Sequence, residues 1–147
     1  MLKKSIVLIV DDSPIMCRFL GLFLEKKFEV VSYTDSVEAL ALIESGFEPD
    51  LVVTDLNMPH LTGIELISAI REILPLVPVL VVSGVKESIE RIKALHAGAD
   101  DFLTKPFHPA ELEVRVSKLI EKGVHQEQQP NRVRQLFASL MKSAAII

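Results

Sequence analysis

Two groups of acidic residues, Asp11-Asp12 and Asp55, follow short apolar runs and could together bind a metal ion. The runs are Ile6–Val10 and Leu51–Thr54, and each ends abruptly in polar residues, as a short buried strand does. If the two strands are parallel neighbours, their carboxyl ends meet at one edge of a sheet. Carboxylates that lie close together raise one another's pKa unless a cation neutralises them. Carboxylate oxygens suit Mg²⁺, so the pattern predicts a metal site with one carboxylate left for chemistry.

Two further polar side chains follow predicted strands. Ser83 ends the run 78–83, and Lys105 comes directly after the run 101–104. A hydroxyl, an ammonium and a cation around one carboxylate form a site for a small tetrahedral dianion. That anion must be covalently attached, because free phosphate is repelled by carboxylates that are not fully neutralised. An aspartate is a competent nucleophile for phosphoryl transfer, and a cation with Lys105 would offset charge on the transferred oxygens. We therefore interpret Asp55 as a phosphoryl acceptor.

Strands and helices are expected to alternate strictly along the chain. The pattern predicts strands over 5–10, 28–33, 51–54, 78–83 and 101–104, and helices over 14–26, 36–45, 62–73, 86–97 and 109–122. Helix start signals include Ser13, either Asp35 or Ser36, and Thr62, and the stop signals are Gly46 and Gly98. Alternation with short loops predicts an α/β fold, a doubly wound five-stranded parallel sheet with five helices. In the flavodoxin-like strand order 2-1-3-4-5, the binding crevice lies between the first and third strands, which carry the three acids.

Composition and charge narrow the class of protein. A chain of 147 residues is expected to form one main domain, and 49% hydrophobic residues with 5% aromatics suit an aliphatic α/β interior. The net charge of −4 gives no reason to expect direct binding to nucleic acid or anionic membranes. No apolar run is long enough for a signal peptide or a transmembrane segment, so we expect a cytoplasmic protein. Cys17 is expected to be partly exposed, because it lies off the apolar stripe of the first predicted helix, which consists of Met16, Phe19, Leu20, Phe23 and Leu24.

Four short motifs resemble those of receiver domains, the CheY-like domains of two-component response regulators. They are Asp11–Ser13, Val53–Pro59, Val82–Gly84 and Gly98–Phe107. Each motif is weak alone, but their order and spacing are highly specific. The resemblance covers residues 1–122 and implies a phosphoprotein of phosphorelay signal transduction.

The resemblance implies a role for each residue of the metal and phosphoryl site. Asp55 would accept a phosphoryl group from a sensor histidine kinase or a phosphotransfer protein. Mg²⁺ would be held by Asp12 directly, by Asp11 through water, by Asp55, and by the backbone carbonyl of Asn57. Lys105 would pair with the phosphoryl oxygens. The domain would not be an enzyme with a separate substrate; it would catalyse its own phosphorylation and dephosphorylation.

The resemblance also implies a switch that responds to phosphorylation. Ser83 would move to hydrogen-bond the phosphorylated Asp55 and would draw Phe102 inward behind it. Relatives often have Tyr or Phe at this position. Phe102 has no hydroxyl, so an inward state would have to be stabilised by packing alone. The Lys105-Pro106 bond is often cis in relatives, which would aim Lys105 into the site.

Other functions fit the residues less well. A flavodoxin-like flavin carrier needs a hydroxyl- and glycine-rich loop where Asp11-Asp12 stand, and these carboxylates would repel its phosphate. A haloacid-dehalogenase-type phosphatase needs a second acid two residues after the nucleophile, where this chain has Asn57. The alternative that stays open is a degenerate receiver that acts as a phosphorylation-independent protein-interaction module.

Four charged residues resemble those by which winged-helix transcription regulators pair their receivers. Arg91 lies in the fourth predicted helix, Asp101 begins the fifth strand, and Glu111 and Arg115 lie in the fifth helix. They predict a homodimer, favoured by phosphorylation, through the face formed by these three elements. The alternative is a solvated face on which Glu111 and Arg115 pair with each other at i, i+4 spacing.

The last 25 residues lie beyond the region that resembles a receiver domain. Residues 123–130 have the polar, glutamine-rich composition of a linker. Residues 131–147 carry an apolar stripe at helical spacing and predict an amphipathic helical extension. A segment this short needs a partner surface to fold. That surface could be its own receiver, a second copy of the chain or a membrane, or the segment could begin an effector domain.

Overall fold

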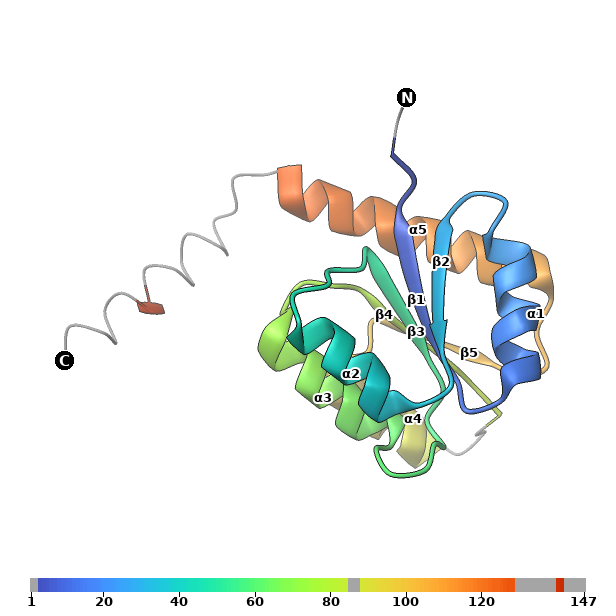
Figure 1. The fold of residues 1–147 in the computed structure, drawn as a ribbon, viewed down its shortest axis with the longest axis horizontal. Coiled ribbons are helices and arrows are strands. Elements are labelled where there is room, and N and C mark those ends of the chain that lie inside the picture. Colours follow the sequence, from blue (N-terminus) through green and yellow to red (C-terminus); the bar gives the residue numbers. More distant parts are fainter. Residues whose placement is uncertain (1–2, 85–87, 129–139, 142–147) are drawn as a thin grey trace.

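The alternation of strands and helices predicted from the sequence is present in the structure (Figure 1). A computed structural model describes residues 3–84, 88–128 and 140–141 of the chain. The strands of this described part are β1 Ile6–Val10, β2 Glu29–Tyr33, β3 Leu51–Thr54, β4 Val79–Ser83 and β5 Asp101–Thr104. Its long helices are α1 Pro14–Leu24, α2 Ser36–Glu44, α3 Gly63–Ile73, α4 Ser88–Ala97 and α5 Pro109–Gln128.

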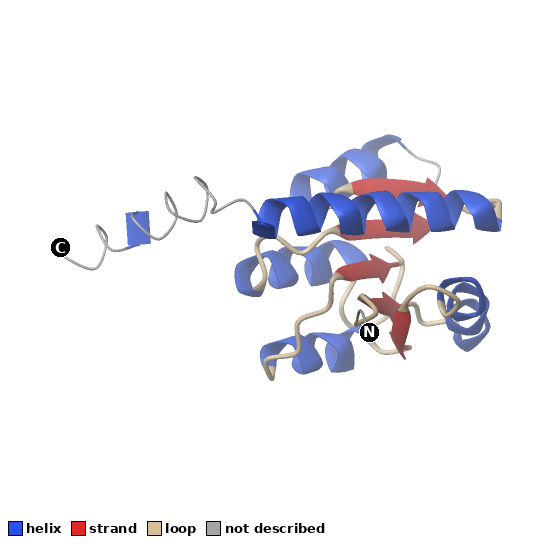
Figure 2. Cartoon of the chain, turned by 90° about the horizontal axis from the view of Figure 1, so that it is seen from above, coloured by secondary structure: helices blue, strands red, loops and turns tan. Residues whose placement is uncertain are grey.

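The strands form one parallel sheet in the order β2-β1-β3-β4-β5. This is the flavodoxin-like order that the sequence predicts, and it places β1 and β3 side by side at the centre. Val10 pairs with Thr54 at the ends of these two strands. The residues that follow them therefore emerge at the same edge of the sheet. Figure 2 shows the parallel strands with helices to either side.

An apolar core fills each face of the sheet, because side chains alternate between the two faces along each strand. On one face, Leu8 and Val10 pack beneath α2, α3 and α4; on the other, Val7 and Ile9 pack beneath α1 and α5 (Figure 1). The helices contribute aliphatic residues such as Leu66 to the first core and such as Leu112 to the second, both fully buried. Burial on both faces explains why β1, β3 and β4 are continuous apolar runs.

Capping residues set where the helices begin. The hydroxyl of Ser13 accepts the backbone N–H of Met16 at 3.2 Å, and the Asp35 carboxylate accepts that of Val37 at 2.8 Å. Thr62 and Glu65 form a capping box at the start of α3, in which each side chain accepts the other residue's backbone N–H. The start signals predicted at Ser13, Asp35 and Thr62 are thus confirmed.

The expected exposure of Cys17 is wrong. Its side chain is buried at 7% relative accessibility, and the thiol donates a hydrogen bond to the backbone carbonyl of Asp11 at 3.2 Å. The reason is the rotation of α1: Cys17, Leu20 and Leu24 face the sheet, whereas Phe19 of the predicted stripe is 38% exposed. Burial raises the pKa of the Cys17 thiol, and the nearby Asp11 carboxylate raises it further.

Helix α5 continues to Gln128, whereas the sequence predicted that it would end at residue 122. The first six residues of the predicted linker, 123–128, are therefore helical. They contain no proline, and Gln and Glu are good helix formers. The amphipathic helix predicted over 131–147 lies outside the described residues apart from Leu140 and Met141. Among the residues that the structure describes, no helix has the length and apolar character needed to cross a bilayer.

Candidate functional site

Three carboxylates meet at the carboxyl edge of the sheet. Asp11 and Asp12 follow β1 and Asp55 follows β3, and one oxygen from each lies within 4.8 Å of the others. Backbone hydrogen bonds extend the ladder to these residues, because the N–H of Asp55 donates to the carbonyl of Val10 at 3.1 Å. The predicted convergence of the three acids is present in the structure.

The three carboxylates differ in their exposure to solvent. Asp11 is 2% exposed, Asp12 is exposed, and Asp55 is intermediate. Burial raises the pKa of Asp11 above its ordinary value of 3.8; the backbone N–H of Ser13 and the charge of Lys105 act in the opposite direction. The Ser13 N–H donates to Asp11 Oδ1 at 2.9 Å. A carboxylate whose charged form is disfavoured by burial gains most from a bound cation.

Lys105 is directed at the acidic cluster. Its Nζ lies 3.2 Å from Asp11 Oδ2 and 3.5 Å from Asp55 Oδ2. The Lys105-Pro106 peptide bond is cis, as expected from the resemblance. The backbone N–H of Lys105 donates to the carbonyl of Ser83 at 2.9 Å, so the ends of β4 and β5 are joined beside the site.

Ser83 and Phe102 share one side of the sheet. Val81 pairs with Phe102 and Ser83 pairs with Thr104 in the parallel register of β4 and β5. Residues two apart in a strand, and residues paired across parallel strands, point to the same face. Ser83 is fully buried, and Phe102 is 5% exposed and belongs to the core beneath α2, α3 and α4. The two predicted switch residues therefore lie on the same face of the sheet, on neighbouring strands.

Asn57 lies in the loop that leaves the site towards α3 and is exposed. The same loop orients the Asp55 side chain, since Asp55 Oδ1 accepts the backbone N–H of Leu56 at 2.7 Å. Gly63, the first residue of α3, packs directly against this loop. A Cβ at Gly63 would lie 2.1 Å from the backbone oxygen of Asp55 and 2.7 Å from Leu56 Cα.

The contribution of Gly63 was missed in the sequence. The signal was present, because Gly63 stands one residue after the helix cap Thr62 and eight residues after Asp55. A glycine so close to a candidate nucleophile is a sign of close backbone approach.

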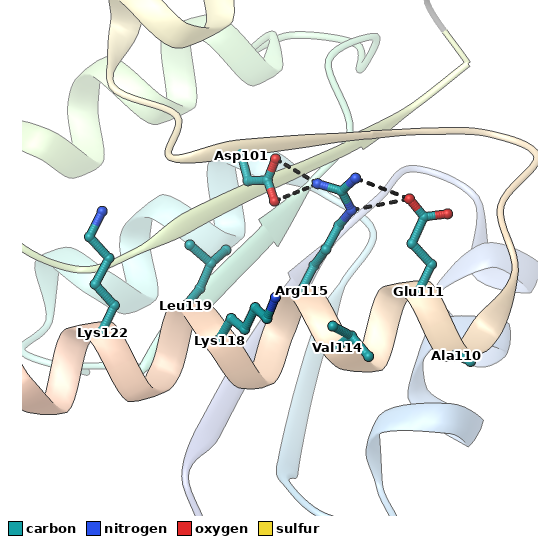
Figure 3. A pocket seen from close by; sticks show the side chains of 8 residues that line it. All are labelled: Asp101, Ala110, Glu111, Val114, Arg115, Lys118, Leu119 and Lys122. Atoms are coloured by element: carbon teal, nitrogen blue, oxygen red, sulfur yellow. Dashed lines mark hydrogen bonds and ion pairs between the residues drawn. The ribbon is translucent and has the colours of Figure 1, made fainter.

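Three of the four predicted interface residues are ion-paired within the chain (Figure 3). Arg115 Nη1 donates to both carboxylate oxygens of Asp101, at 2.9 and 2.7 Å, and Arg115 Nη2 donates to Glu111 Oε1 at 3.0 Å. These hydrogen bonds raise the pKa of Arg115. The i, i+4 pair that the sequence offered as the alternative is thus present. Arg91 lies apart from this network, with its Cζ 5.0 Å from the centroid of the Phe102 ring.

The donor set of the acidic cluster fits Mg²⁺. Its donors are hard carboxylate oxygens, which Mg²⁺ prefers, and they come from three side chains at one edge. The Lys105 ammonium adds a positive charge beside Asp55, which could pair with an anionic group placed there. The arrangement can therefore hold a divalent cation and stabilise negative charge that develops next to Asp55.

Comparisons with known proteins place the chain among signalling domains. A family model described as the response regulator receiver domain matches residues 7–117. The alkaline phosphatase synthesis transcriptional regulatory protein PhoP of Bacillus subtilis is 34% identical over 118 residues, which are 80% of this chain and 49% of PhoP. The transcriptional regulatory protein PrrA of Mycobacterium tuberculosis is 42% identical over 118 residues, 79% of this chain and 50% of PrrA. The chain spans about half the length of these two relatives.

A solved structure agrees with this likeness. The receiver domain of the Francisella response regulator 1452 superposes with a TM-score of 0.74 at 34% sequence identity. The match covers 80% of this chain and 98% of that domain.

Proposed function

The chain belongs to the response regulator receiver domain family, and from this membership we propose that Asp55 accepts a phosphoryl group from a histidine kinase. The observation that carries the proposal is the geometry around Asp55. Its carboxylate lies beside two further carboxylates suited to Mg²⁺ and 3.5 Å from the Lys105 ammonium. This is the charge arrangement that phosphoryl transfer to a carboxylate requires.

The proposed reaction is an in-line transfer that forms an acyl phosphate. A carboxylate oxygen of Asp55 attacks the phosphorus of a phosphohistidine, the P–N bond breaks, and the electron pair returns to the imidazole nitrogen. The hydrogen bond from the Leu56 N–H orients the Asp55 carboxylate for this attack. Lys105 stabilises charge on the phosphoryl oxygens. Water later attacks the phosphorus, the P–O bond to Asp55 breaks, and its electron pair returns to the carboxylate as inorganic phosphate leaves with the protons of the water. The domain thus catalyses both its own phosphorylation and its own dephosphorylation.

Magnesium would be held by Asp11, Asp12, Asp55 and the backbone carbonyl of Asn57. When bound, it would neutralise charge on the acids and on the phosphoryl oxygens. The raised pKa of Asp11 supports this assignment, because burial of its carboxylate is costly without a cation.

Phosphorylation is proposed to act on the surface formed by α4, β5 and α5. Arg91, Asp101, Glu111 and Arg115 are the charged residues of the proposed homodimer contact. Exposed apolar residues accompany them, since Ile92 in α4 and Val114 in α5 are 61% and 51% exposed. Exposed apolar side chains flanked by charges are typical of transient protein–protein interfaces. The ion pairs of Arg115 within the chain would have to be shared or exchanged on dimerisation.

Labelling with a small phosphodonor tests the central claim. The purified chain is incubated with acetyl phosphate, with Mg²⁺ or with a chelator, and its intact mass is measured. We expect Mg²⁺-dependent addition of one phosphoryl group that hydroxylamine removes, as it removes acyl phosphates. Asp55→Asn should abolish the addition, whereas Glu48→Gln, which neutralises an exposed acid elsewhere, should leave it intact. Label that persists in Asp55→Asn would refute the proposal, and absence of label from the unaltered chain would favour the phosphorylation-independent interaction module.

A further inference from the structure

The ring of Phe102 is enclosed by apolar residues and by one cation. It lies in β5 at 5% relative accessibility, within the same core as Val81 of β4 and the fully buried Ala94 of α4. The guanidinium carbon of Arg91, also in α4, lies 5.0 Å from the ring centroid. This is inside the range of about 6 Å in which a cation is attracted to the face of an aromatic ring.

Arg91 differs from the other arginines of the second half of the domain in what it contacts. Arg71 and Arg115 are paired with carboxylates, at 2.8 and 2.7 Å. Within the described part of the chain, no ion pair includes Arg91. Arg91 is an exposed residue, and its guanidinium carbon lies over the Phe102 ring. The contact therefore joins α4 to β5 through an exposed side chain.

The position of Phe102 connects this contact to the phosphoryl site. Ser83 and Val81 lie two residues apart in β4, and Val81 pairs with Phe102. The Ser83 and Phe102 side chains thus share one face of the sheet, beneath α4. The side chain of Phe102 has no hydroxyl that could form a hydrogen bond. Packing alone was expected to hold the ring inward; the structure adds the guanidinium of Arg91.

We propose that Arg91 is a positioning residue of the switch, which holds the Phe102 ring beneath α4 and so stabilises the arrangement in which Ser83 reaches a phosphoryl group on Asp55. The proposal rests on the proposed function of Asp55. Coupling between sites is reciprocal. A contact that favours the inward ring must therefore increase the affinity of the site for a phosphoryl group or its mimic, and loss of the contact must reduce that affinity.

The test is the affinity of the site for beryllofluoride, a phosphoryl mimic, in the presence of Mg²⁺. Binding is followed by amide NMR shifts near Asp55, at a protein concentration where light scattering shows monomers. Arg91→Met retains the length of the side chain and removes its charge, and its dissociation constant should rise roughly two- to fivefold. Arg91→Lys should raise the dissociation constant less than Arg91→Met does. Lys93→Met, which removes a neighbouring exposed charge of α4, should bind as the unaltered chain does.

Fluorination of the ring separates a cation–π contact from a general effect on α4. Phenylalanines with one, two or three ring fluorines at position 102 weaken the negative face of the ring stepwise. Beryllofluoride affinity should fall with each fluorine in the unaltered background and should stay constant in Arg91→Met. The inference would be overturned if Arg91→Met bound beryllofluoride as tightly as the unaltered chain does. It would also be overturned if fluorination changed the affinity equally with and without Arg91. If the unaltered chain bound no beryllofluoride, the proposal for Asp55 would fail first.

Discussion

At the scale of single residues, the burial of the Asp11 carboxylate carries an electrostatic cost. Its carboxyl is almost fully buried, and burial raises its pKa above 3.8 despite the opposing effects of Ser13 and Lys105. A raised pKa in the folded state means that the folded chain binds the proton more tightly than the unfolded chain does. The associated stability is fully present below the unfolded pKa and is lost as pH rises through the folded pKa.

Asp11→Asn should therefore stabilise the metal-free chain at neutral pH. The variant removes a charge whose burial is costly, while the amide oxygen can still accept the Ser13 N–H. We expect a higher melting temperature than that of the unaltered chain at pH 7, with the difference vanishing below pH 3.8. Mg²⁺ should raise the melting temperature of the unaltered chain more than that of the variant. Glu48→Gln is the control, and a variant that is less stable at every pH would contradict this account.

Gly63 is the residue whose lack of a side chain the site requires. Gly63→Ala would place a Cβ against the backbone of Asp55 and Leu56, and neither backbone atom can move without displacing the acceptor loop. We expect a loss of about 2 kcal/mol in the free energy of unfolding and slower labelling of Asp55 by acetyl phosphate.

Gly21→Ala is the matched control for this substitution. Gly21 lies inside α1, and an added Cβ would meet Glu25 and Val30 at ordinary contact distances of 3.5 and 3.9 Å. Alanine at a helical position is favoured over glycine by up to about 1 kcal/mol, so this variant should gain stability. Urea unfolding gives the free energy of unfolding of both variants. Equal changes in the two would show that the close approach of Gly63 to the backbone has no effect on stability.

At the scale of elements, Arg71 joins several segments at the end of the sheet opposite to the acids. From α3, its Nε and Nη2 donate to the carbonyl of Gly98 at 3.0 and 2.6 Å, and its Nη1 donates to the carbonyl of Val77. Nη2 also pairs with Asp100, whose carboxylate accepts the N–H of Val79 at 2.8 Å. One planar guanidinium thus ties the turn after α4 to the start of β4.

Arg71→Met should destabilise the fold by about 2 kcal/mol, because it leaves partly buried carbonyls without their donors. Arg71→Lys should recover only part of this loss, since a single ammonium cannot reproduce the guanidinium fork. Arg18→Met alters an exposed arginine of α1 and should change the free energy of unfolding by less than about 0.5 kcal/mol. Urea unfolding gives the three values, and a result for Arg71→Met as small as that for Arg18→Met would argue against the clamp.

At the scale of the whole molecule, the charged and apolar residues of α4, β5 and α5 are proposed to form one dimer contact. Beryllofluoride with Mg²⁺ should shift the chain towards dimers, as measured by light scattering over a range of protein concentrations. Ile92→Asp and Val114→Asp place a charge on the proposed contact and should keep the chain monomeric.

Ile15→Asp is the control for these two changes. It places the same charge on an apolar side chain of α1 that is 81% exposed and lies outside the proposed contact. This variant should still dimerise in the presence of the mimic. If the unaltered chain stayed monomeric with beryllofluoride and Mg²⁺, the proposed dimer would be refuted.

The order of the elements and the convergence of the acids could be predicted from local patterns. Continuous apolar runs identify strands buried on both faces, and strict alternation with helices leads to a parallel sheet. In a parallel sheet the carboxyl ends of the strands share one edge, which is why Asp11, Asp55 and Lys105 could be brought together without coordinates. The helix caps were predictable for the same reason, because a cap acts within three residues of its own position.

Contacts between distant elements could not be predicted in this way. Whether Cys17 or Phe19 faces the sheet depends on the rotation of α1 against its neighbours, which a broad apolar stripe leaves open. Arg71 reaches Gly98, 27 positions away in the sequence, and Arg91 reaches the Phe102 ring; long side chains find such partners only after helices and strands have packed. Residue types and local spacing therefore specify the strands, the caps and the acidic edge of this protein, whereas packing alone selects which arginine clamps the sheet and which one meets the switch residue.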